Sequence, residues 1–347
     1  MRTITWNDDA NTVEMIDQRL LPQEFKVNAY SRYQDVTEAI RRMVIRGAPA
    51  IGAAAAFGVA LAAYQSKESS RDGLVQELEK AGEALKKARP TAVNLSWAVG
   101  RILKEADAFE GSADDLRERL LASAKAIADE DVEINKRLSE FGAALIEDGD
   151  HIVHHCNTGA LATVDWGTAL GVIRMAHQQG KKIHIFVDET RPRLQGARLT
   201  AWELEQYGIP YDIITDGSSG YLMRKGLVQK VIFGADRVAA NGDVANKIGT
   251  YMLALAAYDN GIPAYSAFPI STVDFELERG DLIPIEERQA AEVLQVQLMG
   301  QRVTPENASA RNFAFDVTPA RLISAWITEK GVINPPFKKN LKDAMAK

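Results

Sequence analysis

Residues 151–156 read His-Ile-Val-His-His-Cys, and a turn of small residues, Asn157-Thr158-Gly159, follows them. From here to about residue 268, short apolar runs rich in β-branched residues alternate with helical patterns. The predicted strands are 151–156, 182–188, 211–215, 228–233 and 263–268, and the helices among them are 160–178, 197–207 and 245–259. This alternation favours a parallel sheet covered on both faces, in which ligands bind beyond the carboxyl ends of the strands.

The residues before about 150 follow a different pattern. Residues 3–31 alternate and break at 8–11 (DDAN), which predicts a short β-hairpin. An apolar helical stripe then covers 36–44 and stops at Gly47, after which Pro49 opens an alanine-rich helix. Further helices are predicted over 70–88, 91–107 and 113–147. We therefore expect an α/β protein: a smaller, mainly helical N-terminal domain (1–147) with the hairpin and a long connecting helix, then a parallel-sheet C-terminal domain (148–347).

The composition excludes several classes of protein. The chain has 347 residues, 25% of them charged, a net charge of −6 and one cysteine, Cys156. A single cysteine can form neither an intramolecular disulfide nor a thiolate zinc cluster. The acidic balance argues against binding to a nucleic-acid backbone, which needs a basic surface.

Membrane contact is not expected either. The N-terminus has no apolar stretch of signal-peptide length. The apolar run 48–63 is shorter than the about 20 residues of a spanning helix, so it is interpreted as a buried core helix. These observations favour a cytoplasmic protein.

Polar groups that follow predicted strands are the candidate functional residues. Cys156 faces the expected crevice near backbone N–H groups, with the role of a small buried hydrophobic residue as the alternative. Burial of Asp236 beyond its strand would raise its pKa and suit it to acid–base work; the alternatives are a helix cap or an ion pair with Arg237. Asn246 and Lys247 are predicted to open a helix, which forms either a phosphate site beside free backbone amides or a solvated helix start.

Two further groups of residues suit a small anionic ligand. The polar segment 188–196 (DETRPRLQG), which contains Gln195, is interpreted as a ligand-binding loop, with a solvated surface loop as the alternative. Arg46 and Arg89 each lie just before a predicted helix, in the motifs Arg-Gly-Ala-Pro and Arg-Pro-Thr. Arginines at two helix starts suit a phosphate ester bound between the domains.

Other chemistries lack their residues. Alternation along the strand puts His154 on the face opposite His151 and His155, so no metal site is expected. No Gly-x-Gly-x-x-Gly follows a strand and no P-loop lysine motif is present. Dinucleotide binding and nucleoside triphosphate hydrolysis therefore lack their usual glycines.

Six motifs, in order along the chain, resemble those of the S-methyl-5-thioribose-1-phosphate isomerase family of methionine salvage. They are Arg46-Gly47-Ala48-Pro49-Ala50-Ile51-Gly52, Arg89-Pro90-Thr91-Ala92-Val93-Asn94-Leu95, Cys156-Asn157-Thr158-Gly159, Glu189-Thr190-Arg191-Pro192, 195–204 (QGARLTAWEL), and Gly234-Ala235-Asp236-Arg237 through Asn246-Lys247-Ile248-Gly249-Thr250. The resemblance runs from the hairpin to about Gly331 and leaves out the lysine-rich tail beyond Pro336. The wider superfamily includes ribose-1,5-bisphosphate isomerases and regulatory subunits of the translation-initiation guanine-nucleotide exchange factor.

The resemblance implies an aldose–ketose isomerisation of 5-methylthioribose 1-phosphate to 5-methylthioribulose 1-phosphate, without a metal or an organic cofactor. It implies Asp236 as the proton donor and Cys156 as an acid–base group or a stabiliser of the transition state. The positions that match substrate contacts are Arg46, Gly47, Ala48, Arg89, Gln195, Asn246 and Lys247. The implied fold joins a mainly helical N-terminal domain to a Rossmann-like C-terminal domain. The resemblance also implies a homodimer, and a small sugar phosphate as the molecule that the protein binds.

Two alternatives remain open. A related sugar-1-phosphate isomerase would act on 5-deoxyribose 1-phosphate or ribose 1,5-bisphosphate with the same chemistry at C1. These substrates differ at C5, where a methylthio group needs apolar walls and a second phosphate needs cations. The other alternative is a regulatory ligand-binding subunit without catalytic activity.

Overall fold

The computed structural model describes residues 1–90 and 92–345, which form two compact units. Unit 1 comprises 1–135 and 158–167, and unit 2 comprises 136–157 and the chain from 168 onward. The division falls inside helix α5 (Ala113–Ala143), earlier than the boundary expected after residue 147. The reason is that α5 serves two cores: Leu120 packs in the core of unit 1, whereas Leu138 packs in a core of unit 2.

Unit 1 opens with a three-stranded antiparallel sheet. Its strands are β1 (Ile4–Asn7), β2 (Thr12–Ile16) and β3 (Val27–Tyr30), paired in sequential order. The side-chain oxygen of Asn7 accepts the backbone N–H groups of Asp9 and Ala10, both at 3.0 Å, and so closes the first turn. The expected hairpin is therefore present and is extended by a third strand.

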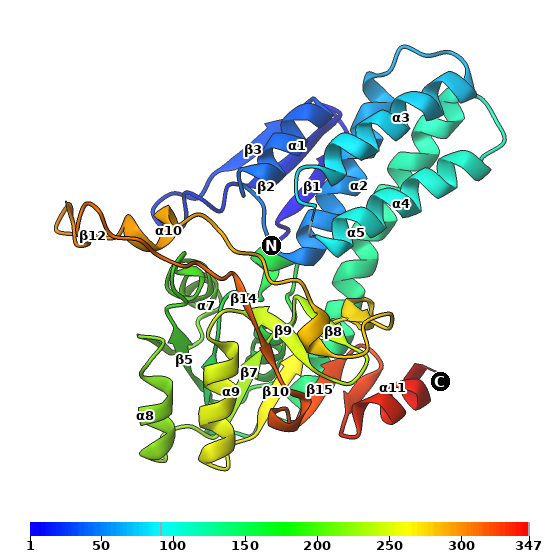
Figure 1. Ribbon diagram of the computed structural model, residues 1–347. Helices are drawn as coiled ribbons and strands as arrows, with labels where there is room; N and C mark the ends of the chain where they lie inside the picture. The colour runs from blue at the N-terminus through cyan, green and yellow to red at the C-terminus, as the bar shows by residue number, and fades with distance from the viewer. Residues whose placement is uncertain (91, 346–347) are drawn as a thin grey trace. The chain divides into compact units, whose positions relative to one another are not determined.

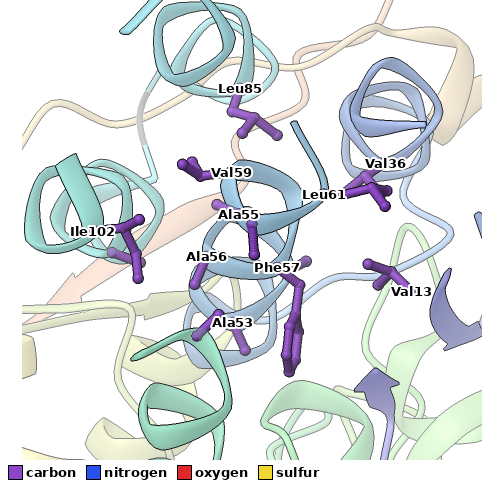
Figure 2. Packing of buried hydrophobic residues seen from close by; sticks show 14 of the residues in the cluster. Val13, Val36, Ala53, Ala55, Ala56, Phe57, Val59, Leu61, Leu85 and Ile102 are labelled. Atoms are coloured by element: carbon purple, nitrogen blue, oxygen red, sulfur yellow. The ribbon is translucent and has the colours of Figure 1, made fainter. Parts of the chain in front are cut away.

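Helix α2 (Ala48–Gln65) is the centre of unit 1. Every residue from Ala50 to Ala63 is buried. Around it pack β2 and the helices α1 (Tyr33–Arg41), α3 (Arg71–Lys86) and α4 (Val93–Ala108). Figure 2 shows Val13, Val36, Leu85 and Ile102 from these neighbours arranged around the alanines of α2. Its small side chains let the neighbours approach closely, so the predicted buried core helix is confirmed.

Among the described residues, α2 is the one helix long and apolar enough to cross a membrane by length and composition. In unit 1, however, 78% of that stretch is buried by the protein itself. The core packing accounts for its apolar character on every side.

A seven-stranded sheet forms the centre of unit 2, in the order β16-β15-β10-β7-β4-β5-β6. The strands are β4 (His151–His154), β5 (His184–Asp188), β6 (Tyr211–Ile214), β7 (Lys230–Phe233), β10 (Ala264–Ala267), β15 (Ala325–Thr328) and β16 (Gly331–Ile333). All pairs are parallel except β15 with β16. The predicted parallel sheet is confirmed, and the last two strands extend it beyond the five that the sequence predicted.

The order of the strands reverses between β4 and β7. The chain adds β5 and β6 on one side of β4, then returns to add β7, β10 and β15 on the other side. Doubly wound sheets bind ligands at such a reversal, outside the carboxyl ends of the strands. The polar residues that follow β4 and β7 therefore lie at the edge where a ligand is expected.

The helices of unit 2 are α6 (Ala169–Gln178), α7 (Ala201–Tyr207), α8 (Ser219–Arg224), α9 (Thr250–Asp259), the short α10 (Ala291–Leu294) and α11 (Phe337–Met345). Figure 1 shows α8 and α9 side by side, and they are in contact. The helix predicted over 160–178 is shorter than expected: Ala160–Ala162 is a single 3₁₀ turn that belongs to unit 1.

A second sheet has the order β11-β8-β9-β14. Its strands are β8 (Arg237–Ala239), β9 (Val244–Lys247), β11 (Val273–Asp274) and β14 (Phe315–Thr318), and a separate small hairpin pairs β12 (Gln297–Leu298) with β13 (Gln301–Arg302). The helix predicted to begin near residue 245 is wrong at its start, because Asn246 and Lys247 pair with Asp316 and Phe315 of β14. Helix α9 begins only at Thr250.

Candidate active site

Cys156 and Asp236 lie beyond two neighbouring strands at the reversal of the sheet. Cys156 follows β4 and Asp236 follows β7, and these strands run parallel with His154 opposite Ile232. Both residues therefore leave the sheet at its carboxyl edge, on either side of the reversal. The structure brings the two predicted catalytic residues to the end of the sheet where ligands bind in doubly wound folds.

Cys156 is held in an uncommon backbone conformation. Its φ is +67°, in the left-handed region, and its side chain is buried. The backbone N–H of Cys156 donates to the hydroxyl of Thr190 at 2.9 Å, and its carbonyl accepts the hydroxyl of Thr200 at 2.6 Å. Such conformations cost free energy and persist only where the surroundings fix them, which happens often at functional sites.

The next residue continues this buried polar network. The amide of Asn157 donates to Thr200 at 3.2 Å and to the carboxylate of Glu203 at 2.8 Å. The second oxygen of Glu203 accepts the hydroxyl of Tyr207 at 3.2 Å. The backbone of Cys156 and the side chain of Asn157 are thus held by buried polar groups. A cysteine that only fills an apolar core has no such surroundings.

Asp236 lies in the link from β7 to β8, and its side chain is exposed. Its backbone N–H donates to the carbonyl of Ala245 at 2.9 Å, which fixes the link against β9. The helix-cap alternative is wrong, because strand β8 follows instead of a helix. Arg237 pairs with Asp274, with Nε to Oδ2 at 3.0 Å. The expected burial is wrong, since Asp236 is exposed.

His155 connects three parts of this edge. Its Nδ1 lies 2.8 Å from Oδ2 of Asp188, at the end of β5, and its Nε2 lies 2.9 Å from the carbonyl oxygen of Ile248. Burial lowers the pKa of His155, but the hydrogen bond and the charge of Asp188 outweigh burial, so the pKa is raised above the ordinary 6.5. Asp188 also accepts the hydroxyl of Ser219 at 2.5 Å.

The segment after β5 is shaped by fixed hydrogen bonds. The backbone N–H groups of Thr190 and Arg191 donate to the carboxylate of Asp216 at 2.7 and 2.8 Å. Arg193 pairs with Glu292 of α10 at 2.8 Å. The segment is therefore an ordered loop and not a freely solvated one.

Gln195 lies at the end of this loop, and its side chain holds a buried oxygen atom that is available to a ligand. Its side chain is 7% exposed. Its Oε1 is buried and has no hydrogen-bond partner among the described residues. A buried acceptor without a donor is costly, so the atom is suited to accept a hydrogen bond from a ligand.

Asn246 and Lys247 end strand β9, so the expected arrangement at a helix start is wrong. The amide of Asn246 donates to the hydroxyl of Thr250 at 3.0 Å, and Nζ of Lys247 donates to the carbonyl of Ala314 at 3.0 Å. The N–H groups at the start of α9 are taken: Gly249 and Tyr251 donate to the carboxylate of Asp316 at 2.7 and 3.1 Å. A phosphate cannot use these amides without displacing Asp316.

The other predicted contacts lie in unit 1. Gly47 precedes α2 with φ of +94°, and a Cβ there would lie 2.2 Å from the carbonyl oxygen of Ala162. Only glycine fits this approach. Arg46, Ala48 and Arg89 are partly exposed beside the starts of α2 and α4. In the Arg-Pro-Thr motif, Thr91 lies outside the described residues.

The three neighbouring histidines have separate partners. His154 bonds to the carbonyl of Ile232 at 2.9 Å, and burial lowers its pKa to about 3. The ring of His151 lies 5.5 Å from that of His184, measured between centroids. His155, Asp188 and Asp216 do place ligand-type atoms within 4.8 Å of one another, but His155 and Asp188 bond to each other there. Asp216 accepts the two backbone N–H groups of the loop described above.

Comparison with known proteins identifies the family. The sequence profile of the initiation factor 2 subunit family matches residues 44–335. The chain belongs to this family. It is 52% identical, over 98% of its length and 97% of the relative, to the protein named methylthioribose-1-phosphate isomerase 2 of Pseudothermotoga lettingae.

Solved structures of this family have the same fold. The crystal structure of 5-methylthioribose 1-phosphate isomerase from Pyrococcus horikoshii superposes with a TM-score of 0.93 and 48% identity, covering 99% of this chain and 96% of that one. A structure described as translation initiation factor eIF-2B, subunit delta, from A. fulgidus gives 0.90 and 43%, with both chains fully covered.

The sequence did not single out the residues that hold the site. Thr190 and Thr200 lie inside motifs that carried the family resemblance, yet nothing local shows that their hydroxyls bond to Cys156. The partners of His155 come from segments far along the chain. The one signal available was position, since Asp188 ends a predicted strand and so lies at the ligand-binding edge.

Proposed function

We propose that this protein converts 5-methylthioribose 1-phosphate to 5-methylthioribulose 1-phosphate. The observation that carries the proposal is the 52% identity over almost the whole length to a relative named for this activity. The positions of Cys156 and Asp236 at the reversal of the sheet support it, because this is where doubly wound folds bind ligands.

The proposed reaction begins with an acid. The anomeric oxygen of the substrate is esterified, so the ring cannot open as in a free sugar. Asp236, which is exposed in the structure and which bound substrate would cover, donates a proton to the ring oxygen while the bond from C1 to that oxygen breaks, which leaves an oxocarbenium-like centre at C1. Hydrogen then moves from C2 to C1, as a hydride or as a proton through an enol. The C2 hydroxyl gives its proton back to the Asp236 carboxylate and becomes the ketone, so the acid is restored.

The remaining residues have separate proposed roles. Cys156 assists the hydrogen transfer as an acid–base group or stabilises its transition state. Lys247 supplies a cation for the phosphate, and Gln195 accepts a hydrogen bond from a sugar hydroxyl through its buried Oε1. The family resemblance implies Arg46 and Arg89 as further substrate contacts. Gly47, Ala48 and Asn246 complete the proposed substrate contacts.

The test is an assay with three substrates. The purified protein is incubated with 5-methylthioribose 1-phosphate, 5-deoxyribose 1-phosphate and ribose 1,5-bisphosphate, and ketose formation is followed by NMR. We expect the highest kcat/KM for the methylthio compound, and no ketose from it would refute the proposal. In deuterated water, deuterium at C1 of the product indicates transfer as a proton, and its absence indicates hydride transfer.

A second candidate function comes from the 43% identical structure described as an eIF-2B subunit. A regulatory subunit would bind a sugar phosphate or a nucleotide without turnover. Binding of 5-methylthioribose 1-phosphate in calorimetry, with no ketose formed by the same sample, would favour this candidate.

We further propose that unit 2 is a Rossmann-like catalytic domain and that the protein acts as a cytoplasmic homodimer. The strand order of its parallel sheet supports the first statement. Light scattering of the purified protein tests the homodimer, and a monomer at micromolar concentration would contradict it.

A further inference from the structure

His155 is a buried residue beside Cys156 for which the proposed reaction has no step. It is 1% exposed, and each of its ring nitrogens faces an oxygen atom. The carbonyl oxygen of Ile248 can only accept a hydrogen bond, so Nε2 carries a hydrogen. One ring therefore joins the chain at Cys156 to the turn that follows Lys247.

We propose that His155 is a positioning residue that fixes the strand end bearing Cys156 relative to the Asn246–Lys247 strand end, through its hydrogen bond to Ile248. The inference rests on the proposed function, because it concerns the same site. Asp188 orients the ring, since its Oδ2 lies 2.8 Å from Nδ1 of His155. The hydroxyl of Ser219 donates to Oδ1 of Asp188 at 2.5 Å and so orients this carboxylate. A residue anchored in this way loses little freedom when it holds its partner.

The turn itself is built around the ring. Gly249 has φ of +103°, and a Cβ at this position would lie 2.9 Å from Cε1 of His155. On its other side the turn is tied to β14, since Ile248 donates to the carbonyl of Ala314 at 3.0 Å and Gly249 to Asp316 at 2.7 Å. His155 links this turn to the parallel sheet, whereas these other two bonds lead to the second sheet.

Two amide substitutions separate the two bonds of the ring. In His155→Gln the amide nitrogen reaches about as far as Nε2 and can still donate to Ile248. In His155→Asn it lies nearer the place of Nδ1, so it can donate to Asp188 but leaves the Ile248 carbonyl unpaired. Both variants remove a buried ring, so similar losses of thermal stability are expected.

The expected kinetic results differ between these variants. We expect His155→Asn to raise KM for 5-methylthioribose 1-phosphate about tenfold or more, a factor that corresponds to about 1.4 kcal/mol. The KM of His155→Gln should stay within about threefold of the wild-type value, because this variant keeps the hydrogen bond to Ile248. His154→Asn is the matched control, because His154 bonds to Ile232 within the sheet. This variant should be less stable than the wild type but have the same KM.

Hydrogen exchange provides a readout that needs no turnover. In the protein without substrate, the amides of 246–251 should exchange faster in His155→Asn and at the wild-type rate in His155→Gln. Equal changes in exchange or in KM for the two variants would overturn the proposal and leave His155 with a role in stability only. A wild-type protein without isomerase activity would refute the proposed function instead, and the exchange rates would then decide the role of His155 by themselves.

Discussion

Replacing Thr190 by valine should disable the site while leaving the fold intact. The hydroxyl of Thr190 accepts the backbone N–H of Cys156 at 2.9 Å and donates to the carbonyl of Asp188 at 3.0 Å. Valine has nearly the same shape and the same branching at Cβ, so packing and the backbone preference at φ of +62° change little. The substitution therefore removes two hydrogen bonds and little else.

The size of the effect follows from burial. Thr190 is fully buried, so the two backbone groups lose their partner where water has little access. Each unpaired buried group costs about 1–3 kcal/mol, which gives a loss of about 2 kcal/mol or more in the free energy of unfolding. Cys156 also loses one of the bonds that hold its left-handed backbone, and a displacement of about 1 Å in a catalytic group can lower kcat about 100-fold.

The assay compares this variant with Thr328→Val. Thr328 is also fully buried; its hydroxyl accepts the N–H of Lys330 at 3.2 Å and donates to the carbonyl of Gly331 at 2.9 Å, in the turn between β15 and β16. Urea unfolding should show similar losses for both variants, whereas only Thr190→Val should lower kcat. Equal kcat values for the two variants would refute the idea that Thr190 acts through Cys156.

Three further predictions concern other parts of the chain. Asp236→Asn should lower kcat by about 10²–10⁴-fold, because it removes the proposed acid, and should leave the melting temperature unchanged, since the side chain is exposed. Gly47→Ala should destabilise far more than Gly149→Ala in thermal unfolding, because both have positive φ but only Gly47 has an atom within 4 Å, the Ala162 oxygen at 2.2 Å. Burial raises the pKa of Glu292, but hydrogen bonds from Arg288 and Arg193 outweigh burial and lower the pKa from 4.5 to about 2, so the stabilising contribution is present above pH 4.5 and is lost as the pH falls toward 2. The free energy of unfolding should therefore decrease over this range, by less than the full pKa shift implies because solvent screens a partly exposed carboxylate, and Glu292→Gln should remove this dependence in urea titrations at several pH values.

The features predicted from the sequence are those that depend on local pattern. The alternation after residue 150 predicted the parallel sheet, and the rule about carboxyl ends then selected Cys156 and Asp236 before any contact was known. The apolar stretch after Pro49 predicted the buried α2, because a helix that is apolar all round has to be covered on every side.

The features that the sequence did not predict depend on partners distant in the chain. Asn246 and Lys247 were assigned to a helix, but they pair with β14, whose residues come about seventy positions later. The end of the N-terminal domain was placed at the end of a helix, whereas the helix is shared between two cores. The exposed position of Asp236 follows from the insertion of β8 after β7, which a helical interpretation of the segment did not include.

The path of the chain around Cys156 also bears on how the protein folds. The chain passes from one unit to the other at three places: within α5, between Asn157 and Thr158, and between Gly167 and Thr168. Neither unit is a continuous stretch of chain. A fragment ending at residue 135 lacks segment 158–167, which contains the Ala162 against which Gly47 packs. A fragment starting at residue 136 contains this segment without the rest of unit 1. Truncation at the helix should therefore yield two incomplete fragments, and separate expression of the halves requires a circular permutation or a loop that replaces 158–167.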